Sequence, residues 1–207
     1  MEDCQIIRPK RRASKRDYRE LATKSSWSVI FVILALVAVR PLMVNHILDR
    51  AEAYTAFSLN EEAKRQCNKA LLLDSECSRA WCQLARVYKT EGNREMAYDA
   101  YQRATATDLT NGPAHFELGL LYVQDGQHQQ AIPYFERVRS LGPGKARQNR
   151  PNAFAHHKAA LDMLALCYEK AGHTQKAEFT LEEIRVFYPT YSGAEARLAK
   201  LKAQRQN

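Results

Sequence analysis

Two stretches of this sequence repeat the same small and aromatic residues at a spacing of 34 residues, and a third follows after an insertion. The first consists of Trp81, Leu84, Ala85, Tyr88, Gly92, Ala97, Tyr101 and Ala104. The second consists of His115, Leu118, Gly119, Tyr122, Gly126, Ala131, Phe135 and Val138, and the third of Leu161, Leu164, Ala165, Tyr168, Gly172, Ala177, Leu181 and Ile184. This period is typical of stacked helical hairpins. The sequence therefore predicts an all-α solenoid, a fold that holds other chains and carries no chemistry by default.

Recurring residues predict how each hairpin is built. A glycine follows the first helix, where a left-handed residue ends a helix at no steric cost: Gly92, Gly126 and Gly172. A small residue stands where the two helices must come close: Ala85, Gly119 and Ala165. A large residue is expected to fill the space beneath the next hairpin: Tyr101, Phe135 and Leu181. Pro143 and Pro189 are expected to stop the second helix because proline cannot continue its hydrogen bonding.

The order of these residues resembles the tetratricopeptide repeat family, whose pattern has Trp, Leu, Gly, Tyr, Ala, Phe, Ala and Pro at fixed places. The departures are Ala85 for glycine and Leu109 for proline in one repeat, and His115 for tryptophan and Val138 for alanine in the next. A degenerate unit lies upstream: Ala51, Tyr54, Ala63 and Ala70, with Ser58 in place of the turn glycine and Cys67 in place of the large aromatic residue. The resemblance covers residues 44–191 and implies three to four repeats.

Two further segments, an insertion within the repeats and the carboxy-terminal residues, have structures that the sequence predicts. An insertion that includes residues 144–152 is rich in glycine, proline and basic residues and predicts an exposed loop, either tolerated or part of a binding face. Residues 192–207 place Ala194, Leu198 and Leu201 on one side of a helix. We expect this helix to cap the last hairpin.

Residues 27–39 are apolar and uncharged, and Leu42, Met43 and Val44 extend the run beyond Arg40. About eighteen residues of helix reach ~27 Å, which just spans a bilayer. A buried core helix, a cleaved secretory signal and an uncleaved signal anchor are the alternatives. The run lacks a polar face and lacks small residues at both cleavage positions, and Trp27 suits a membrane interface. These features favour a single-pass anchor over residues 27–44.

The tail over residues 1–26 carries an excess of basic residues: Arg8, Lys10, Arg11, Arg12, Lys15, Arg16, Arg19 and Lys24. This bias predicts a cytoplasmic tail in the inner (cytoplasmic) membrane and an extracytoplasmic repeat domain, periplasmic in a bacterium. Arg11-Arg12-Ala13-Ser14 also resembles a basophilic kinase site, and residues 10–16 a nuclear import signal or nucleic-acid patch. Orientation and contact with anionic lipid are favoured beside a membrane span. No interleaved aromatic residues support nucleic-acid binding.

Residue patterns that carry chemistry are missing from the sequence. The five cysteines (Cys4, Cys67, Cys77, Cys82 and Cys167) form no Cys-x-x-Cys pair. Two of Cys67, Cys77 and Cys82 could form a disulfide outside the cytoplasm, or all could stay reduced. The adjacent His156 and His157 point to different faces of a helix and do not suit one metal ion. We expect no cofactor, no metal and no enzymatic activity.

The resemblance implies that the first helix of each hairpin lines a groove for a protein partner. The groove residues expected on this basis are Arg79, Cys82, Gln83, Arg86, Lys89, Phe116, Glu117, Leu120, Val123, Gln124, Asp162, Leu166 and Glu169, preceded by Leu48, Glu52 and Thr55. This mixture suits a helix or extended peptide with an acidic part and an apolar part. The carboxylate clamp of chaperone adaptors is absent, because its places carry Leu48, Glu52, Gln83, Ala159 and Met163.

The sequence therefore predicts four segments: a tail over 1–26, an anchor over 27–44, a repeat domain over 45–191 and a cap over 192–207. The function expected from them is a non-catalytic, membrane-tethered scaffold that assembles or stabilises an envelope or membrane complex. Two alternatives stay open. One is a structural accessory subunit of a large membrane complex, and the other is a regulatory subunit that presents a partner enzyme.

Overall fold

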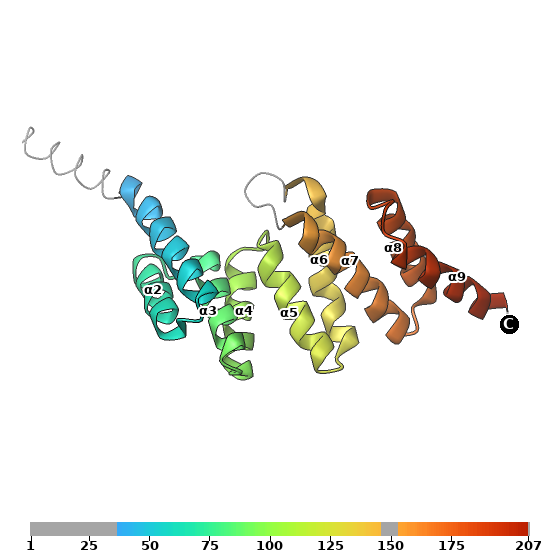
Figure 1. Ribbon diagram of the computed structural model, residues 1–207, viewed down its shortest axis with the longest axis horizontal. Coiled ribbons are helices and arrows are strands. Elements are labelled where there is room, and N and C mark those ends of the chain that lie inside the picture. Colours follow the sequence, from blue (N-terminus) through green and yellow to red (C-terminus); the bar gives the residue numbers. More distant parts are fainter. Residues whose placement is uncertain (1–36, 146–152, 207) are drawn as a thin grey trace, which may run out of the picture. The chain divides into compact units, whose positions relative to one another are not determined.

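A computed structural model describes residues 37–145 and 153–206, and every regular element in these ranges is an α-helix (Figure 1). The chain divides into a unit that ends at Asn45 and a unit over His46–Asn207. Of the first unit only residues 37–45 are described, and they are helical. Most of the predicted anchor and the whole predicted tail lie outside the described residues. In the part of the chain that is described, no helix is long and apolar enough to cross a membrane.

The second unit consists of helical hairpins that follow one another along the chain. The first hairpin of this unit pairs the helical residues 46–56 with α2 (Asn60–Leu73). The next hairpins are α3 (Ser78–Thr90) with α4 (Arg94–Thr107), α5 (Gly112–Gln124) with α6 (His128–Lys145), and α7 (Ala153–Lys170) with α8 (Thr174–Phe187). A last helix, α9, covers Gly193–Gln206. From α2 to α9, each helix packs against the next one along the chain. The predicted all-α solenoid is therefore confirmed for the described residues.

The turns inside the hairpins share one backbone geometry. Gly92, Gly126 and Gly172 have φ angles of 75°, 73° and 78°, in the left-handed region that glycine enters freely. Ser58 has a φ of 58° at the equivalent place. In each turn the amide that follows donates to the carbonyl of a first-helix tyrosine, as Asn93 N–H does to Tyr88 at 2.9 Å. The degenerate upstream unit therefore turns in the same way as its neighbours.

The second helices end near the positions that carry proline in the repeat pattern. In α6 the backbone leaves the helical region at Gly142, with φ 67° and ψ 167°, directly before Pro143. The α8 helix ends at Phe187, two residues before Pro189. Asp74 and Asp108 take extended conformations after α2 and α4. An extended residue thus ends these two helices without a proline.

The core lies between the helices of each hairpin and the next hairpin. Tyr101, Phe135 and Leu181 are fully buried, as the sequence predicted. A Cβ atom added at Gly119 would lie 2.8 Å from Cε1 of Phe135, which is closer than such atoms pack. Ala85 and Ala165 are fully buried at the equivalent positions. The small residue therefore sets how closely the two helices of a hairpin approach.

The last helix buries one side and leaves the other polar. Ala194, Leu198 and Leu201 are buried in the same apolar cluster as the third-repeat core. Glu195 and Lys202 lie 34 residues after the buried Leu161 and Tyr168, and both are exposed. Charged residues therefore stand where a hairpin would need apolar ones. The capping role of α9 stays a prediction.

The remaining structural expectations have mixed outcomes. Among the described residues, no disulfide joins Cys67, Cys77, Cys82 or Cys167, which matches the reduced alternative. The predicted exposed loop coincides with residues 146–152, which lie outside the described ranges.

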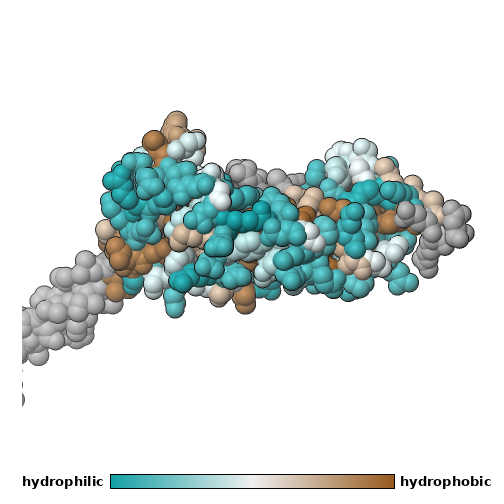
Figure 2. All heavy atoms as spheres, turned by 90° about the horizontal axis from the view of Figure 1, so that it is seen from below, coloured by the Kyte–Doolittle hydropathy of each residue, from teal (hydrophilic) through white to brown (hydrophobic). Residues whose placement is uncertain are grey.

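The face seen in Figure 2 is mostly hydrophilic with separate hydrophobic areas. Among the described residues, isolated apolar side chains such as Phe57 and Leu72 are exposed.

Candidate partner-binding surface

The predicted groove residues lie on the first helices of the hairpins, which neighbour one another through side-chain contacts. We call their shared surface the first-helix face; it is formed by residues 46–56, α3, α5, α7 and α9. The positions that carry the predicted residues recur once per hairpin. A partner lying across this face would therefore contact several repeats together.

The contact between residues 46–56 and α3 is polar. Arg79 Nη2 lies 2.7 Å from Asp49 Oδ1 and 3.1 Å from Glu52 Oε1. Gln83 is buried and donates from Nε2 to Thr55 Oγ1 at 2.8 Å. Because their polar atoms already bond to the preceding helix, Arg79 and Gln83 primarily join two hairpins.

The contact between α3 and α5 combines an ion pair with buried rings. Lys89 Nζ lies 2.6 Å from Glu117 Oε2. Phe116 is 8% exposed, and its ring packs edge-on against Phe135 at 6.0 Å between centroids and against His156 of α7 at 5.2 Å. Phe116 therefore joins α5 to α6 and α7 and offers little surface to a partner.

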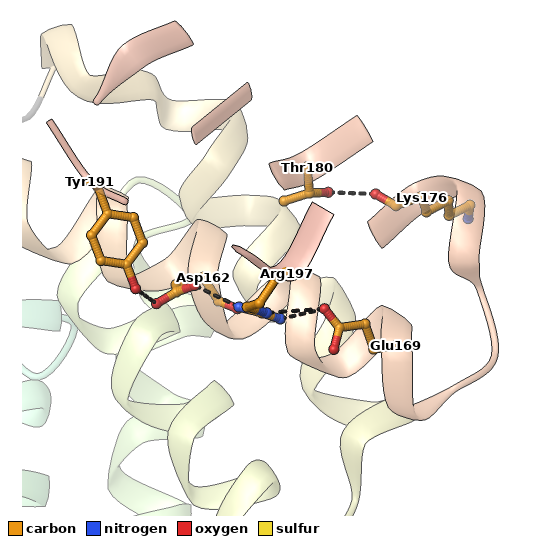
Figure 3. Close-up of polar contacts among 6 residues, drawn as sticks. All are labelled: Asp162, Glu169, Lys176, Thr180, Tyr191 and Arg197. Carbon is orange, nitrogen blue, oxygen red and sulfur yellow. Dashed lines mark hydrogen bonds and ion pairs between the residues drawn. The ribbon is translucent and has the colours of Figure 1, made fainter. Parts of the chain in front are cut away.

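The acidic residues predicted on α7 bond to α9 and to the segment that connects α8 with α9 (Figure 3). Arg197 of α9 lies 2.7 Å from Asp162 Oδ1 through Nη1 and 2.7 Å from Glu169 Oε1 through Nη2. Tyr191 donates from its hydroxyl to Asp162 Oδ2 at 2.7 Å. The single guanidinium pairs with both carboxylates and offsets one of their two negative charges, so it joins α7 to α9.

The other predicted residues differ in exposure. Arg86 and Gln124 are exposed, and Cys82 is 8% exposed. Three are half-buried: Leu120, Val123 and Leu166. The structure thus leaves a cation and a group of apolar side chains accessible in the middle of the face. Sequence reasoning did not predict the bonds that Asp49, Tyr191 and Arg197 make to groove residues, because each of these bonds joins residues more than 25 positions apart.

A buried hydroxyl lies below the first-helix face. Tyr101 projects from α4, is fully buried, and its hydroxyl has no hydrogen-bond partner among the described residues. Burial raises its pKa above the usual value of 10.0, and the charges of Glu117 and Arg86 also act on it. Tyr101 therefore stays protonated and acts as a core residue.

Histidines on the first helices are packed into the core. Burial is the main cause that lowers the pKa of both His115 and His157 below 6.5. His157 Nδ1 lies 2.8 Å from the Tyr188 hydroxyl. Within residues 37–145 and 153–206, no group of three or more histidine, cysteine or carboxylate side chains is arranged to hold a metal ion.

The stacked hairpins and their shared surface define a helical repeat protein of the kind that presents a binding face. Residues 78–111 and 112–141 match one tetratricopeptide repeat model, and residues 159–191 match a second. The chain therefore carries tetratricopeptide repeats, as the resemblance implied. No curated protein matches the sequence significantly.

Solved structures agree with this fold. The chain is similar to YrrB, described as a TPR protein with an unusual peptide-binding site, at 21% identity and a TM-score of 0.62, covering 78% of this chain and 77% of that one. It is similar to MamA at 23% identity and a TM-score of 0.55, covering 91% and 99%. It is also similar to PilW, described as a widely conserved type IV pilus biogenesis factor, at 19% identity and a TM-score of 0.56, covering 78% and 69%. At these identities the likeness concerns the fold.

Proposed function

We propose that this protein is a non-catalytic scaffold that binds a protein partner on the first-helix face and helps to assemble or stabilise a membrane complex. The observation that carries the proposal is the row of first helices whose charged residues largely pair with one another, leaving Arg86 exposed beside half-buried Leu120 and Val123. An accessible apolar strip with a nearby charge is the composition of peptide-recognition surfaces. YrrB and PilW, whose descriptions name peptide binding and pilus biogenesis, are examples of what this fold serves elsewhere.

The proposal includes a membrane tether at residues 27–44. It is supported by the described start of the helix over 37–56, where four large apolar side chains are solvent-exposed: Val37 at 62%, Val39 at 46%, Leu42 at 68% and Met43 at 50%. These residues continue the apolar run of the sequence. Exposed apolar side chains clustered on one short segment indicate contact with lipid or protein. The basic tail would then lie in the cytoplasm beside anionic lipid, with the repeats on the other side.

Site-specific photo-crosslinking in intact membranes tests the scaffold function. A photoreactive residue at Gln124, on the first-helix face, should yield a defined crosslinked partner, whereas the same residue at Lys69, exposed on α2, should not. Substitution of Leu120 by Asp should remove the crosslink while the helical circular dichroism is retained. Equal crosslinking from Gln124 and Lys69, or an unchanged crosslink in the Leu120→Asp variant, would show that the partner binds elsewhere.

Alkaline carbonate extraction tests the tether separately. The full-length chain should stay with the membrane pellet, and protease added to spheroplasts should digest the repeats while the amino-terminal tail stays protected. Release of the chain into the carbonate supernatant would remove the tether from the proposal and leave the binding face intact.

A further inference from the structure

One position recurs through the first-helix face with a distinctive set of side chains. Successive first helices carry Glu52, Arg86, Leu120, Leu166 and Lys200 at equivalent places in the repeat. The helices that carry them neighbour one another through Arg79–Glu52, Lys89–Glu117, Phe116–His156 and Arg197–Glu169. We call Arg86, Leu120, Leu166 and Lys200 the central row.

The two cations of the central row differ from three neighbouring cations of the face in having no carboxylate partner among the described residues. Arg79, Lys89 and Arg197 each lie within 3.1 Å of a carboxylate on a neighbouring first helix. Arg86 and Lys200 are exposed, and neither forms an ion pair with another described residue. The intramolecular pairs have therefore left one positive charge at each end of the row.

The middle of the row is apolar. Leu120 and Leu166 are half-buried, and Leu120 packs against the third-repeat core cluster. Half-buried leucines can lose more surface to a partner at little cost in side-chain entropy, because their packing already restricts them. Neighbouring carboxylates on α7, Asp162 and Glu169, both pair with Arg197, which offsets one of their two negative charges and reduces their repulsion of an acidic ligand.

We propose that the partner segment is an extended peptide with an apolar centre and an acidic group on either side, held by Arg86 at one end and Lys200 at the other. This inference rests on the proposed function and names the chemistry of the partner. Three steps between neighbouring helices of ~8–10 Å give roughly 24–30 Å between the cations. An extended chain rises about 3.3 Å per residue, so the two acidic groups stand about 7–9 residues apart.

Fluorescence anisotropy with a synthetic peptide tests the spacing and the charge. The probe is a labelled fourteen-residue peptide with aspartates eight positions apart, leucines between them, and serine and glycine elsewhere. We expect it to bind the full-length chain in nonionic detergent, and to bind about tenfold more weakly to Arg86→Glu and to Lys200→Glu. A peptide with the aspartates four positions apart should behave like either single variant, because only one cation can be reached.

Two controls keep the outcome specific. Lys69→Glu changes the net charge equally at an exposed site on α2 that forms no ion pair with a described residue, and it should leave the affinity unchanged. The double variant Arg86→Glu/Lys200→Glu should bind a probe that carries lysines in place of the aspartates. Equal losses for Lys69→Glu and Arg86→Glu, or no spacing dependence, would overturn the proposal.

The result also separates this inference from the proposed function. If the probe fails to bind while Leu120→Asp still removes the membrane crosslink, the face binds its partner through other chemistry and the central-row inference is wrong. If neither experiment implicates the first-helix face, the proposed function fails as well.

Discussion

Ser58 and Gly92 occupy the same place in consecutive hairpins and share a left-handed backbone, with φ angles of 58° and 75°. The amide after each closes the turn in the same way: Leu59 N–H donates to Tyr54 and Asn93 N–H to Tyr88, both at 2.9 Å. A left-handed conformation costs a residue with a side chain roughly 1–2 kcal/mol, whereas glycine adopts it freely. The first hairpin therefore carries a local strain that its neighbours lack.

Replacing Ser58 by Gly should raise the free energy of unfolding by about 0.5–1 kcal/mol, since relief of the strain exceeds the extra unfolded-state entropy of glycine. The thermal midpoint, followed by circular dichroism, measures the change. Gly92→Ser is the matched control with the opposite sign: no heavy atom lies within 4 Å of a Cβ placed there, so backbone conformation alone is tested. A lower midpoint for Ser58→Gly would mean that the hydroxyl stabilises the turn.

Gly119 and Phe135 should be energetically coupled. A methyl group at Gly119 meets the Phe135 ring at 2.8 Å, so Gly119→Ala is expected to lose about 1–2 kcal/mol of packing, partly offset by the better helix propensity of alanine. In the third repeat, Leu181 and Ala165 occupy the equivalent positions, and both are buried in one apolar cluster. Gly119→Ala should therefore be better tolerated with Phe135→Leu, by about 1 kcal/mol in a double-mutant cycle. Additive effects would show that the close contact carries no cost.

Stability should fall on mild acidification. Burial, with the nearby charges of Arg137 and Arg139, holds the pKa values of His115 and His157 below 6.5 in the folded chain. The unfolded chain binds these protons first, so stability is constant above pH 6.5 and decreases as the pH falls through it, by about 1.4 kcal/mol per pH unit for each histidine.

Urea midpoints at pH 7.5 and 5.5 measure this acid dependence. His115→Leu, which copies Leu161 of the third repeat, should remove part of the difference between the two values. The charge of Asp108 acts to raise the pKa of His115, and His157 Nδ1 lies 2.8 Å from the Tyr188 hydroxyl. Equal midpoints at both pH values would contradict the lowered pKa values.

Arg197 should hold α9 on the third hairpin. Its removal in Arg197→Ala leaves Asp162 and Glu169, whose side chains are 20% and 24% exposed, without their cation. We expect a loss of about 1–2 kcal/mol and faster hydrogen exchange of the α9 amides. Arg185→Ala is the matched control, because among the described residues Arg185 pairs only with Glu182 on its own helix, and it is 55% exposed; its loss should change stability by less than about 0.5 kcal/mol. Unchanged exchange in α9 would assign the docking to Leu198 and Leu201 alone.

The repeat pattern predicted the fold well because each hairpin is specified by residues within one period. Gly119, Phe135 and the turn glycines do in the structure what their types and spacing indicated. The start of α7 was not predicted: the helix begins at Ala153, so His157 lies inside a helix at the place where Asn111 caps α5. The sequence analysis placed His156 and His157 on a helix, but a pattern read from Leu161 does not show at which residue that helix begins.

The predicted binding face was harder to judge because exposure there depends on the neighbouring hairpin. Gln83 is buried because Thr55, 28 residues earlier, bonds to it, and Phe116 is buried because His156 packs on it. Glu169 has a cation because Arg197 stands on a helix outside the clear repeats. Periodicity predicts the side of the helix on which a residue lies. Which residue of a neighbouring hairpin packs against it depends on how the hairpins stack in three dimensions.

The polar outer side of α9 limits how far this architecture can grow. Glu195 and Lys202 stand in place of the apolar pair Leu161 and Tyr168. A second molecule therefore finds no apolar surface to pack against at α9, and head-to-tail filaments are disfavoured. An engineered longer array would first need both charges exchanged for large apolar side chains. Addition of further hairpins is thus controlled by two charged residues on the outer side of α9.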